Sequence, residues 1–334
     1  MYVGLDISKN STVCVGKDKE GVLLFEGSFP TSQKGFDRIL GRVGKDSKFV
    51  LEASTHGVFA YDYLKEMGAD VKVANPGRIR MICDSEKKTD RNDAEILADL
   101  LRTNMLPESY LPNKNERELR DIIRQRKSIV NMRSSVKNKI RAILARDGIK
   151  IMDKNVLGVK ALVALTKVEL QSPVQQDALE RLIQIAGTLT ATIDDYDGVI
   201  RERYQTLPYA KLLDTIPGID CHSAVHIASA IGDIGRFPSD EELASYAGLA
   251  PQTYQSGDVR RDRGLRHGDK LLRSLIVQDA HAAVRCSRRF RKYYLKMVRK
   301  KGKQKAIISV SRKMIEIIYV MLTRGEPYNE DYGK

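Results

Sequence analysis

The chain has 334 residues, with 57 lysines and arginines against 43 aspartates and glutamates, and a formal net charge of +14. Its hydrophobic content of 42% is that of ordinary globular domains, and the length allows two or three of them. No apolar run approaches the roughly 20 residues of a membrane span, so we expect no membrane partner. The positive charge favours nucleic acid as the partner.

Four scattered cysteines, Cys14, Cys83, Cys221 and Cys286, form no C-x-x-C pair. Their spacing argues against structural zinc and against a disulfide framework, and indicates a reducing cytosol. The first residues lead directly into a predicted strand, so no signal peptide is expected.

The first part of the chain, residues 1–108, predicts an α/β domain. Strands are expected at 2–7, 11–16, 22–28, 48–52 and 70–74, with hairpin turns near Gly16 and Gly21. A helix at 57–67 is stopped by Gly68. Three hairpin strands followed by alternating helix and strand predict a mixed sheet with helices packed on it, the layout of RNase H.

Four carboxylates stand at informative places in this domain. Asp6 and Glu52 each end an apolar strand, and Asp90 and Asp93 open a helical segment at 90–101. A pair of magnesium ions that catalyses a reaction of a phosphodiester needs several carboxylate ligands. The alternative for the helical pair is a capping box, with Asp90 as the N-cap and Asp93 as the third helical residue. That alternative leaves Asp6 and Glu52 unexplained.

Residues 114–206 predict two heptad-patterned helices. The first is strongly basic and ends at Gly148, and the second shows spacings of three and four residues. The first repeat comprises Ile122, Ile129, Val136 and Ile143, and the second Leu179, Leu182, Ala186, Leu189, Ile193, Tyr196 and Ile200. These repeats indicate a coiled-coil hairpin, a dimer seam, or both, and a plain helical bundle is an equal alternative. Between them, residues 159–165 predict a short helix or a linker.

Residues 208–325 predict a mostly helical domain, followed by a tail at 326–334. The segment 216–219 either forms a phosphate-binding helix-hairpin-helix turn or a purely structural turn between two helices. No acidic residue occurs from Ala280 to Ile315, which favours phosphate contacts over a merely solvated basic face. The candidates there are Arg288, Arg289, Arg291, Lys292, Lys300 and Lys301, and Tyr293 and Tyr294 among them could stack on bases.

Several of these segments together resemble one known family. Residues 4–9, 51–54 and 88–94 are similar to the DEDD motif of the IS110-family transposases, and residues 216–219, 247–251 and 255–257 resemble its C-terminal motifs. The similarity extends over nearly the whole chain in the family's order. Related pilin-gene invertases share this architecture.

The resemblance implies a RuvC-like DEDD domain, a coiled-coil dimerisation region and a C-terminal transposase domain. It implies Mg²⁺ or Mn²⁺ held by the four carboxylates, and a nucleophilic serine at Ser256 that links covalently to DNA. Cations that follow this serine are Arg260, Arg261, Arg263, Arg266 and Lys270. The implied partners are DNA at the element ends and the target, a structured non-coding guide RNA, and further copies in a dimer or tetramer. The implied location is the prokaryotic cytoplasm, at the nucleoid.

Two other functions stay open at this point. A two-metal nuclease or junction resolvase of the same fold would use water in place of Ser256, since a serine before a glycine is commonly a turn residue. A non-catalytic nucleic-acid-binding protein would keep the carboxylates for structure alone. His222 and His226, four residues apart, have no third ligand nearby in the sequence, so packing or phosphate contacts are expected of them rather than a metal.

Overall fold

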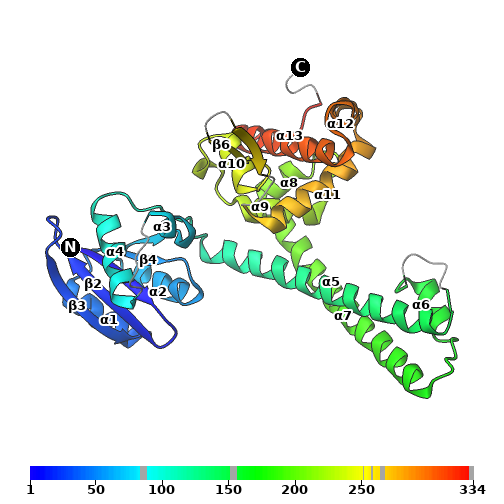
Figure 1. Ribbon diagram of the computed structural model, residues 1–334, viewed down its shortest axis with the longest axis horizontal. Coiled ribbons are helices and arrows are strands. Elements are labelled where there is room, and N and C mark those ends of the chain that lie inside the picture. Colours follow the sequence, from blue (N-terminus) through cyan, green and yellow to red (C-terminus); the bar gives the residue numbers. More distant parts are fainter. Residues whose placement is uncertain (83–88, 151–155, 251, 257–258, 264–267, 331–334) are drawn as a thin grey trace. The chain divides into compact units, whose positions relative to one another are not determined.

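The computed structural model describes residues 1–82, 89–150, 156–250, 252–256, 259–263 and 268–330. The chain divides into two compact units, Met1–Pro112 and Asn113–Lys334, and each is described by itself (Figure 1). None of the helices in the described part of the chain is long and apolar enough to cross a membrane.

The first unit contains a mixed five-stranded sheet in the order β3-β2-β1-β4-β5. The strands are β1 (Tyr2–Ile7), β2 (Ser11–Lys17), β3 (Leu23–Pro30), β4 (Lys48–Glu52) and β5 (Asp70–Ala74). The first three form an antiparallel meander, and β4 and β5 run parallel to β1. The expected turn near Gly21 is confirmed by its φ of 92°. The expected turn at Gly16 is wrong, because Gly16 lies inside β2 at an irregularity in its pairing with β3.

Helices cover both faces of this sheet. Alternate residues of β1 point to opposite faces, so Val3 and Leu5 enter the core formed with α1 (Gln33–Val43) and α2 (Thr55–Glu66). The other face carries α3 (Pro76–Ile82) and α4 (Asp90–Arg102). There Val50 of β4 packs with the buried Leu97 and Leu101 of α4. The mixed sheet between helical layers confirms the α/β prediction for this part of the chain.

Two long helices begin the second unit, α5 (Lys114–Arg146) and α7 (Pro173–Thr206), with the short α6 (Val159–Leu165) between them. They are antiparallel, because Arg126 of α5 bonds Asp197 of α7 while Arg133 lies 3.4 Å from Thr190. The buried residues of α7 recur every seven positions, at Leu179, Ala186, Ile193 and Ile200. The heptad pattern expected for α7 therefore faces the protein interior.

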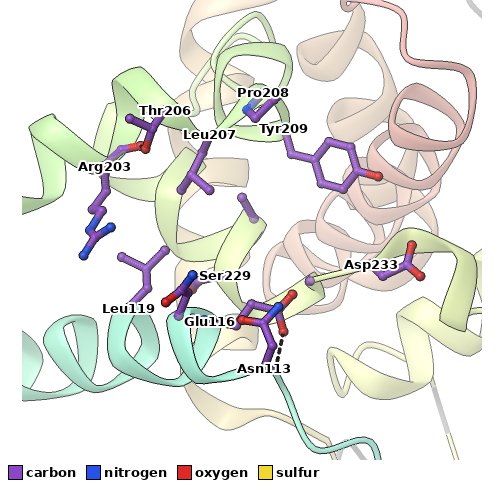
Figure 2. Close-up of a pocket in the computed structure, with 13 residues that line it drawn as sticks. Asn113, Glu116, Leu119, Arg203, Thr206, Leu207, Pro208, Tyr209, Ser229 and Asp233 are labelled. Carbon is purple, nitrogen blue, oxygen red and sulfur yellow. Dashed lines mark hydrogen bonds between the residues drawn. The ribbon is translucent and has the colours of Figure 1, made fainter.

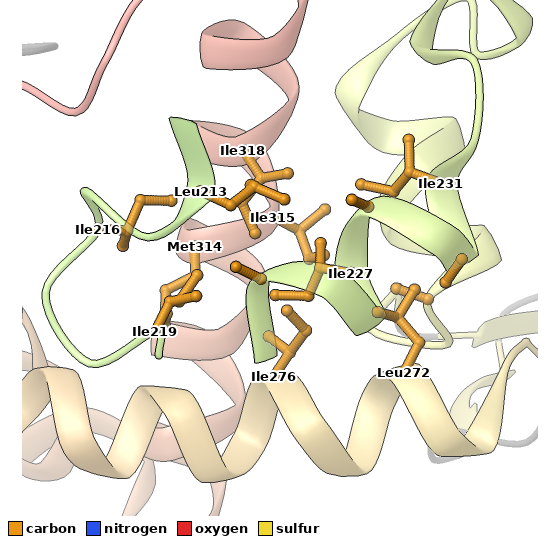
Figure 3. Packing of buried hydrophobic residues seen from close by; sticks show 14 of the residues in the cluster. Leu213, Ile216, Ile219, Ile227, Ile231, Leu272, Ile276, Met314, Ile315 and Ile318 are labelled. Carbon is orange, nitrogen blue, oxygen red and sulfur yellow. The ribbon is translucent and has the colours of Figure 1, made fainter. Parts of the chain in front are cut away.

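The rest of the second unit is a helical bundle around one large core. Its elements are α8 (Pro208–Leu213), α9 (Cys221–Ile231), η1 (Ile234–Arg236), α10 (Asp240–Tyr246), α11 (Lys270–Cys286), α12 (Arg288–Lys301) and α13 (Lys303–Arg324), with the hairpin strands β6 (Gln252–Ser256) and β7 (Val259–Arg263). Helix α13 supplies Met314, Ile315 and Ile318, which meet Ile227 of α9 and Ile276 of α11 in this core (Figure 3).

The helix pair is joined to this bundle through the C-terminal end of α9. Arg120 of α5 donates to the carbonyl oxygens of Ser229 and Ala230 at 2.7 and 2.9 Å. Arg236 donates to the next carbonyl, that of Ile231, at 2.9 Å. The last carbonyls of a helix have no partner within the helix and carry its negative dipole end. Arg120 therefore fastens α5 to the end of α9, and Arg236 of η1 caps the same helix end.

Candidate active site

The ends of β1 and β4 place Asp6 and Glu52 side by side along the sheet. The two strands are parallel and pair Leu5 with Leu51, so Asp6 and Glu52 are the next residues on neighbouring strands. Asp6 follows Gly4 at a spacing of two and Glu52 follows Val50 in the same way. Both carboxylates therefore lie on the face that α4 covers, and both are half-buried.

Gly4 brings α4 unusually close to β1. A Cβ atom added at Gly4 would lie 1.9 Å from the backbone oxygen of Ala94 and 2.7 Å from the backbone nitrogen of Ala98. No residue other than glycine fits there without displacing the helix. The glycine of the Gly-Leu-Asp segment thus fixes the contact between helix and strand.

The direction of α4 follows from Lys17, a lysine that the sequence did not single out. Lys17 pairs with Tyr2 in the sheet, and its Nζ lies 2.8 Å from Glu95 and 2.6 Å from Asp99. The C-terminal half of α4 therefore lies over the beginning of β1. Its first turn extends beyond Gly4 toward Asp6.

Helix and strand spacings agree with this placement. From Ala94 back to Asp90 the helix rises about 6 Å, and from Gly4 to Asp6 the strand advances about 6.6 Å. The first turn of α4, with Asp90 and Asp93, consequently lies level with the strand ends that carry Asp6 and Glu52. We call these four residues the acidic edge.

Thr89, and not Asp90, is the N-cap of α4. The Thr89 hydroxyl accepts from the backbone nitrogen of Asn92 at 3.2 Å. The capping-box alternative for Asp90 and Asp93 is therefore wrong, because the cap is already supplied by the preceding residue. Asp90 is exposed and Asp93 is half-buried, and neither forms an ion pair with a lysine or arginine in the described chain.

The acidic edge is suited to hard cations by its donor chemistry, since carboxylate oxygens are the ligands that Mg²⁺ and Mn²⁺ prefer. Across the described residues, however, no three histidine, cysteine or acidic side chains stand close enough together to hold a metal ion as they are. The fold brings the backbone positions to one edge of the sheet, while a closed ligand cage is not formed.

Ser256 is the last residue of β6, where it pairs with Val259 at the turn end of a two-stranded hairpin. Arg260, Arg261 and Arg263 lie in β7, and Arg266 lies outside the described residues. Lys270 is the exposed first residue of α11. Three of the cations that the sequence analysis grouped with Ser256 therefore lie on the strand that pairs with β6.

Two glycines hold the base of this hairpin. Gly248, just before β6, has φ 67°, and Gly268, just after the arginine-rich loop, has φ 96°. A Cβ atom added at Gly268 would lie 2.4 Å from the Gly248 nitrogen, and the Asp269 nitrogen donates to the Tyr246 oxygen at 2.8 Å. The two chain ends of the hairpin thus meet at a backbone contact that only glycines allow.

The predicted phosphate-contacting residues of α12 differ in what they do. Arg288, Lys292, Lys300 and Lys301 are exposed. Arg289 donates to the Glu330 carbonyl oxygen at 2.9 Å, and Arg291 donates to that of Arg285 at 2.8 Å. These two arginines hold the C-terminal segment and the end of α11, whereas the other four extend into solvent.

The turn at 216–219 is packed against α11. Gly218 has φ 97°, and a Cβ atom there would lie 2.4 Å from the Ala283 nitrogen. Asp220 caps α9 by accepting from the Ser223 nitrogen at 2.8 Å. A carboxylate already occupies the helix start that a phosphate would use, so these contacts favour the structural turn between two helices.

A cavity of about 560 Å³ lies among the start of α5, the junction of α7 and α8, and the end of α9 (Figure 2). Its polar groups serve local structure: Asn113 and Glu116 form the capping box of α5, and Asp233 caps η1. With lining charges of both signs, it has no bias toward an anionic ligand. We assign no function to it.

Comparison with known proteins relates the chain to transposases. A family model described as "Transposase" matches residues 3–147, and one described as "Transposase IS116/IS110/IS902 family" matches residues 210–295. The transposase of insertion sequence element IS1111A from Coxiella burnetii is 22% identical over 98% of this chain and 90% of its own length. The transposase of element IS1328 from Yersinia enterocolitica is 23% identical over 98% of both chains. The pilin gene-inverting protein of Moraxella bovis is 38% identical over 36% of this chain and 39% of its own.

The matches and the fold define the class of protein, an enzyme that transposes or recombines DNA. Because the two models lie in order along the chain and full-length relatives are transposases, the chain belongs to the IS110 family of transposases. The DEDD type of the first model is consistent with the use of a divalent metal ion.

Proposed function

We propose that this transposase cleaves and exchanges DNA strands with the four carboxylates of the acidic edge and the hydroxyl of Ser256. The observation that supports this most is the register of Asp6 and Glu52 on neighbouring strands, level with the first turn of α4. In this proposal the edge completes its ligand set when Mg²⁺ or Mn²⁺ and the DNA phosphate arrive. The strand order supports the RNase H-like, RuvC-like reading of residues 1–108.

Asp6, Glu52, Asp90 and Asp93 would hold the divalent ions. Bound there, the ions would neutralise charge on the attacked phosphate and favour the ionised form of the attacking hydroxyl. The carboxylates themselves would repel DNA without such ions, because like charges about 4 Å apart repel by roughly 4 kcal/mol at an effective dielectric of 20. Cleavage is thereby limited to the metal-loaded protein.

The Ser256 oxygen would form a bond to phosphorus while the phosphorus–oxygen bond to the leaving strand breaks. The proton of the serine hydroxyl leaves during the attack, and the leaving strand ends as a free hydroxyl. A hydroxyl of a second strand then attacks the phosphoserine, restores the serine and joins the new strand. Arg260, Arg261, Arg263, Arg266 and Lys270 would stabilise the negative charge that develops on the phosphoryl oxygens.

Several further properties belong to the same proposal. A structured non-coding RNA would pair with donor and target DNA, while the protein contacts backbone and shape. The helix pair α5–α7 would form the coiled-coil region of residues 114–206 and join copies into a dimer or tetramer. Residues 208–325 would form the serine-bearing transposase domain, with a tail at 326–334. Arg288, Arg289, Arg291, Lys292, Lys300 and Lys301 would contact nucleic acid, in the prokaryotic cytoplasm at the nucleoid.

A covalent-trapping assay tests the chemistry. The purified protein, with its co-purifying RNA, is incubated with element-end and target DNA and Mg²⁺, denatured and resolved on a gel, beside Ser256→Ala and Asp90→Ala. We expect a protein–DNA adduct in the wild type alone, mapped by mass spectrometry to Ser256. Nicked DNA without an adduct, unchanged in Ser256→Ala, would replace the serine mechanism by hydrolysis with water.

A further inference from the structure

We infer that a cleft between α5, α9 and α11 binds a single unstacked nucleotide of a nucleic-acid strand. The cleft has a volume of about 220 Å³, and a smaller hollow adjoins it along the same three helices. Both hollows are lined by Ile123, His226 and Leu271. The site lies outside the acidic edge and the Ser256 hairpin, and it rests only on the family's binding of nucleic acid, not on either step of the chemistry.

Size and walls fit one base. Ile123 and Ile200 are buried, and Val130, Leu271 and Leu275 are half-buried around the same space. These side chains offer an apolar surface against which a base can lie flat. A volume of 220 Å³ is below the roughly 300–1,000 Å³ of pockets for drug-sized ligands, which suits one base rather than two.

His226 supplies a polar group without a protein partner. No described residue donates to or accepts from its imidazole, although the ring contributes to both hollows. Burial lowers the pKa of His226 to about 4, so at neutral pH the ring carries one donor and one acceptor nitrogen. A neutral ring of this kind can bond to the edge of a base, as can the exposed Ser274 and Gln278 on the opposite wall.

Two cations of α5, Arg126 and Lys127, line the cleft. Arg126 is held by Asp197, with an Nη2–Oδ2 distance of 3.2 Å, and His222 lies 3.4 Å from the same carboxylate. Lys127, the residue after Arg126, is half-buried and pairs with no carboxylate among the described residues. Its ammonium is therefore available for the phosphate of the nucleotide whose base enters the cleft.

The smaller hollow borders Asp269, the residue that follows the glycine base of the Ser256 hairpin. Asp269 directly follows Gly268 at this base and caps α11 through the nitrogens of Leu271 and Leu272. In this inference, a nucleic-acid strand bound at the hairpin continues along α11. Binding of one nucleotide there would hold the strand in register next to the hairpin.

Direct binding measurements test this inference. Fluorescein-labelled single-stranded DNA, single-stranded RNA and a DNA duplex are titrated in EDTA, so that no cleavage contributes. Ser274→Leu fills the cleft from its exposed rim, and Ser135→Leu is the matched control on an exposed part of α5. Lys127→Ala removes the cation, and Lys139→Ala is its control on the same helix.

We expect Ser274→Leu to weaken binding of one single-stranded probe at least about fivefold, since stacking of one base contributes about 1–3 kcal/mol. Lys127→Ala should weaken the same probe and lower the salt dependence of its affinity by about one ion. The probe affected tells whether the strand is DNA or RNA, and the controls should stay within about twofold of the wild type.

A benzophenone side chain at Gln278 gives an independent readout and should crosslink to that same probe. Affinities within twofold for all three probes in both cleft variants, with no crosslink, would overturn the inference. Weaker binding of the duplex alone would also overturn the inference, because paired bases cannot enter the cleft. Nicking without an adduct, unchanged in Ser256→Ala, would overturn the serine mechanism and change none of these binding results, so the two proposals fail separately.

Discussion

The carboxylates of α4 have different surroundings in its first turn and further along the helix. Beyond the first turn, Glu95 and Asp99 flank the buried Lys17, whose side chain is only 8% exposed. Burial alone would lower the pKa of Lys17, but hydrogen bonds and charge attraction from Asp99 and Glu95 outweigh it, and the pKa is raised. In the first turn, Asp90 and Asp93 meet the strand ends of Asp6 and Glu52 without a described lysine or arginine paired to either aspartate.

The difference separates a structural charge cluster from a candidate catalytic one. Lys17 and Arg102, which lies 3.1 Å from Asp99, together balance the charges of Glu95 and Asp99 and hold the helix in place. Four carboxylates at one edge of a sheet accumulate negative charge, which a basic DNA-binding protein keeps at a cost unless cations compensate it. The Lys17 contacts therefore position the helix, and the acidic edge is the proposed place for metal ions.

The largest effect is expected at the acidic edge. Asp6→Asn and Asp90→Asn should each lower strand cleavage at least about a hundredfold, because metal ions contribute several kcal/mol to such reactions. Thermal stability should be unchanged or higher, since one like charge is removed. Cleavage assays and thermal melts check this. Asp70→Asn, at the exposed start of β5, is the control and should retain activity.

Gly4→Ala should destabilise the first unit by about 1–3 kcal/mol through overpacking, because the new methyl group meets the Ala94 backbone. Activity should fall with it as α4 moves away from β1. Urea unfolding measures the loss. Gly41→Ala in α1 is the matched control, since nothing lies within 4 Å of its Cβ position. A Gly4→Ala protein as stable as Gly41→Ala would contradict the close approach.

Lys17→Met should cost about 2 kcal/mol of unfolding free energy, less than the roughly 3–5 kcal/mol for a fully buried pair because its carboxylates are partly exposed. Lys19→Met, at an 82% exposed side chain, should change stability by less than about 0.5 kcal/mol. Because the pKa of Lys17 is raised above its ordinary value of 10.5, deprotonation of Lys17 removes this contribution only as the pH rises above that value. Urea titrations between pH 6 and 9 should therefore give a constant difference.

The smallest effect concerns Asp279 of α11, which is 5% exposed and accepts from the Ser223 hydroxyl at 2.8 Å. Burial raises its pKa to about 7. The folded state thus keeps a proton that the unfolded state loses near pH 4, and stability falls as pH rises from about 4 to 7. Asp279→Asn should gain about 1–2 kcal/mol relative to wild type between pH 5 and 8. A difference that does not vary with pH would refute this.

The sequence predicted the sheet of the first unit well, because short apolar runs such as residues 48–52 are typical of buried strands. Gly16 was misread as a turn, since a glycine within a strand shows no local sign that Met1 packs against it. Lys17 was missed because its partner Asp99 lies 82 residues away. A lysine at the end of a strand ordinarily faces solvent, and only the tertiary contact reveals otherwise.

Helix α5 shows a second limit. A repeat through Ile122, Ile129, Val136 and Ile143 was expected, and Val136 is buried. The other buried residues lie off this repeat, with Leu119 and Ile123 near the start of the helix and Ile140 and Leu144 near its end. The first two enter the core of the bundle and Ile140 enters the core shared with α7. One helix that serves two cores changes its buried face along its length, which a single heptad register cannot describe.

The candidate site was predicted by residue type and strand position, and its assembly depended on features invisible in the sequence. The parallel pairing of β1 with β4 and the reverse run of α4 bring Asp6, Glu52 and Asp90 to one edge. Ser256 was singled out through resemblance, because the residues around a turn serine look the same in structural turns, and the hairpin that carries it was not predicted. Its glycine base, Gly248 with Gly268, became clear only from backbone contacts.

Manganese binding tests the central claim most directly. Electron paramagnetic resonance of Mn²⁺ titrated into the full-length protein, without DNA, should show saturable binding that is lost in the double variant Asp6→Asn, Asp90→Asn. The variant Glu95→Gln at the Lys17 contacts should keep it. Equal Mn²⁺ binding by the wild type and the double variant would contradict the assignment of the acidic edge as the metal site.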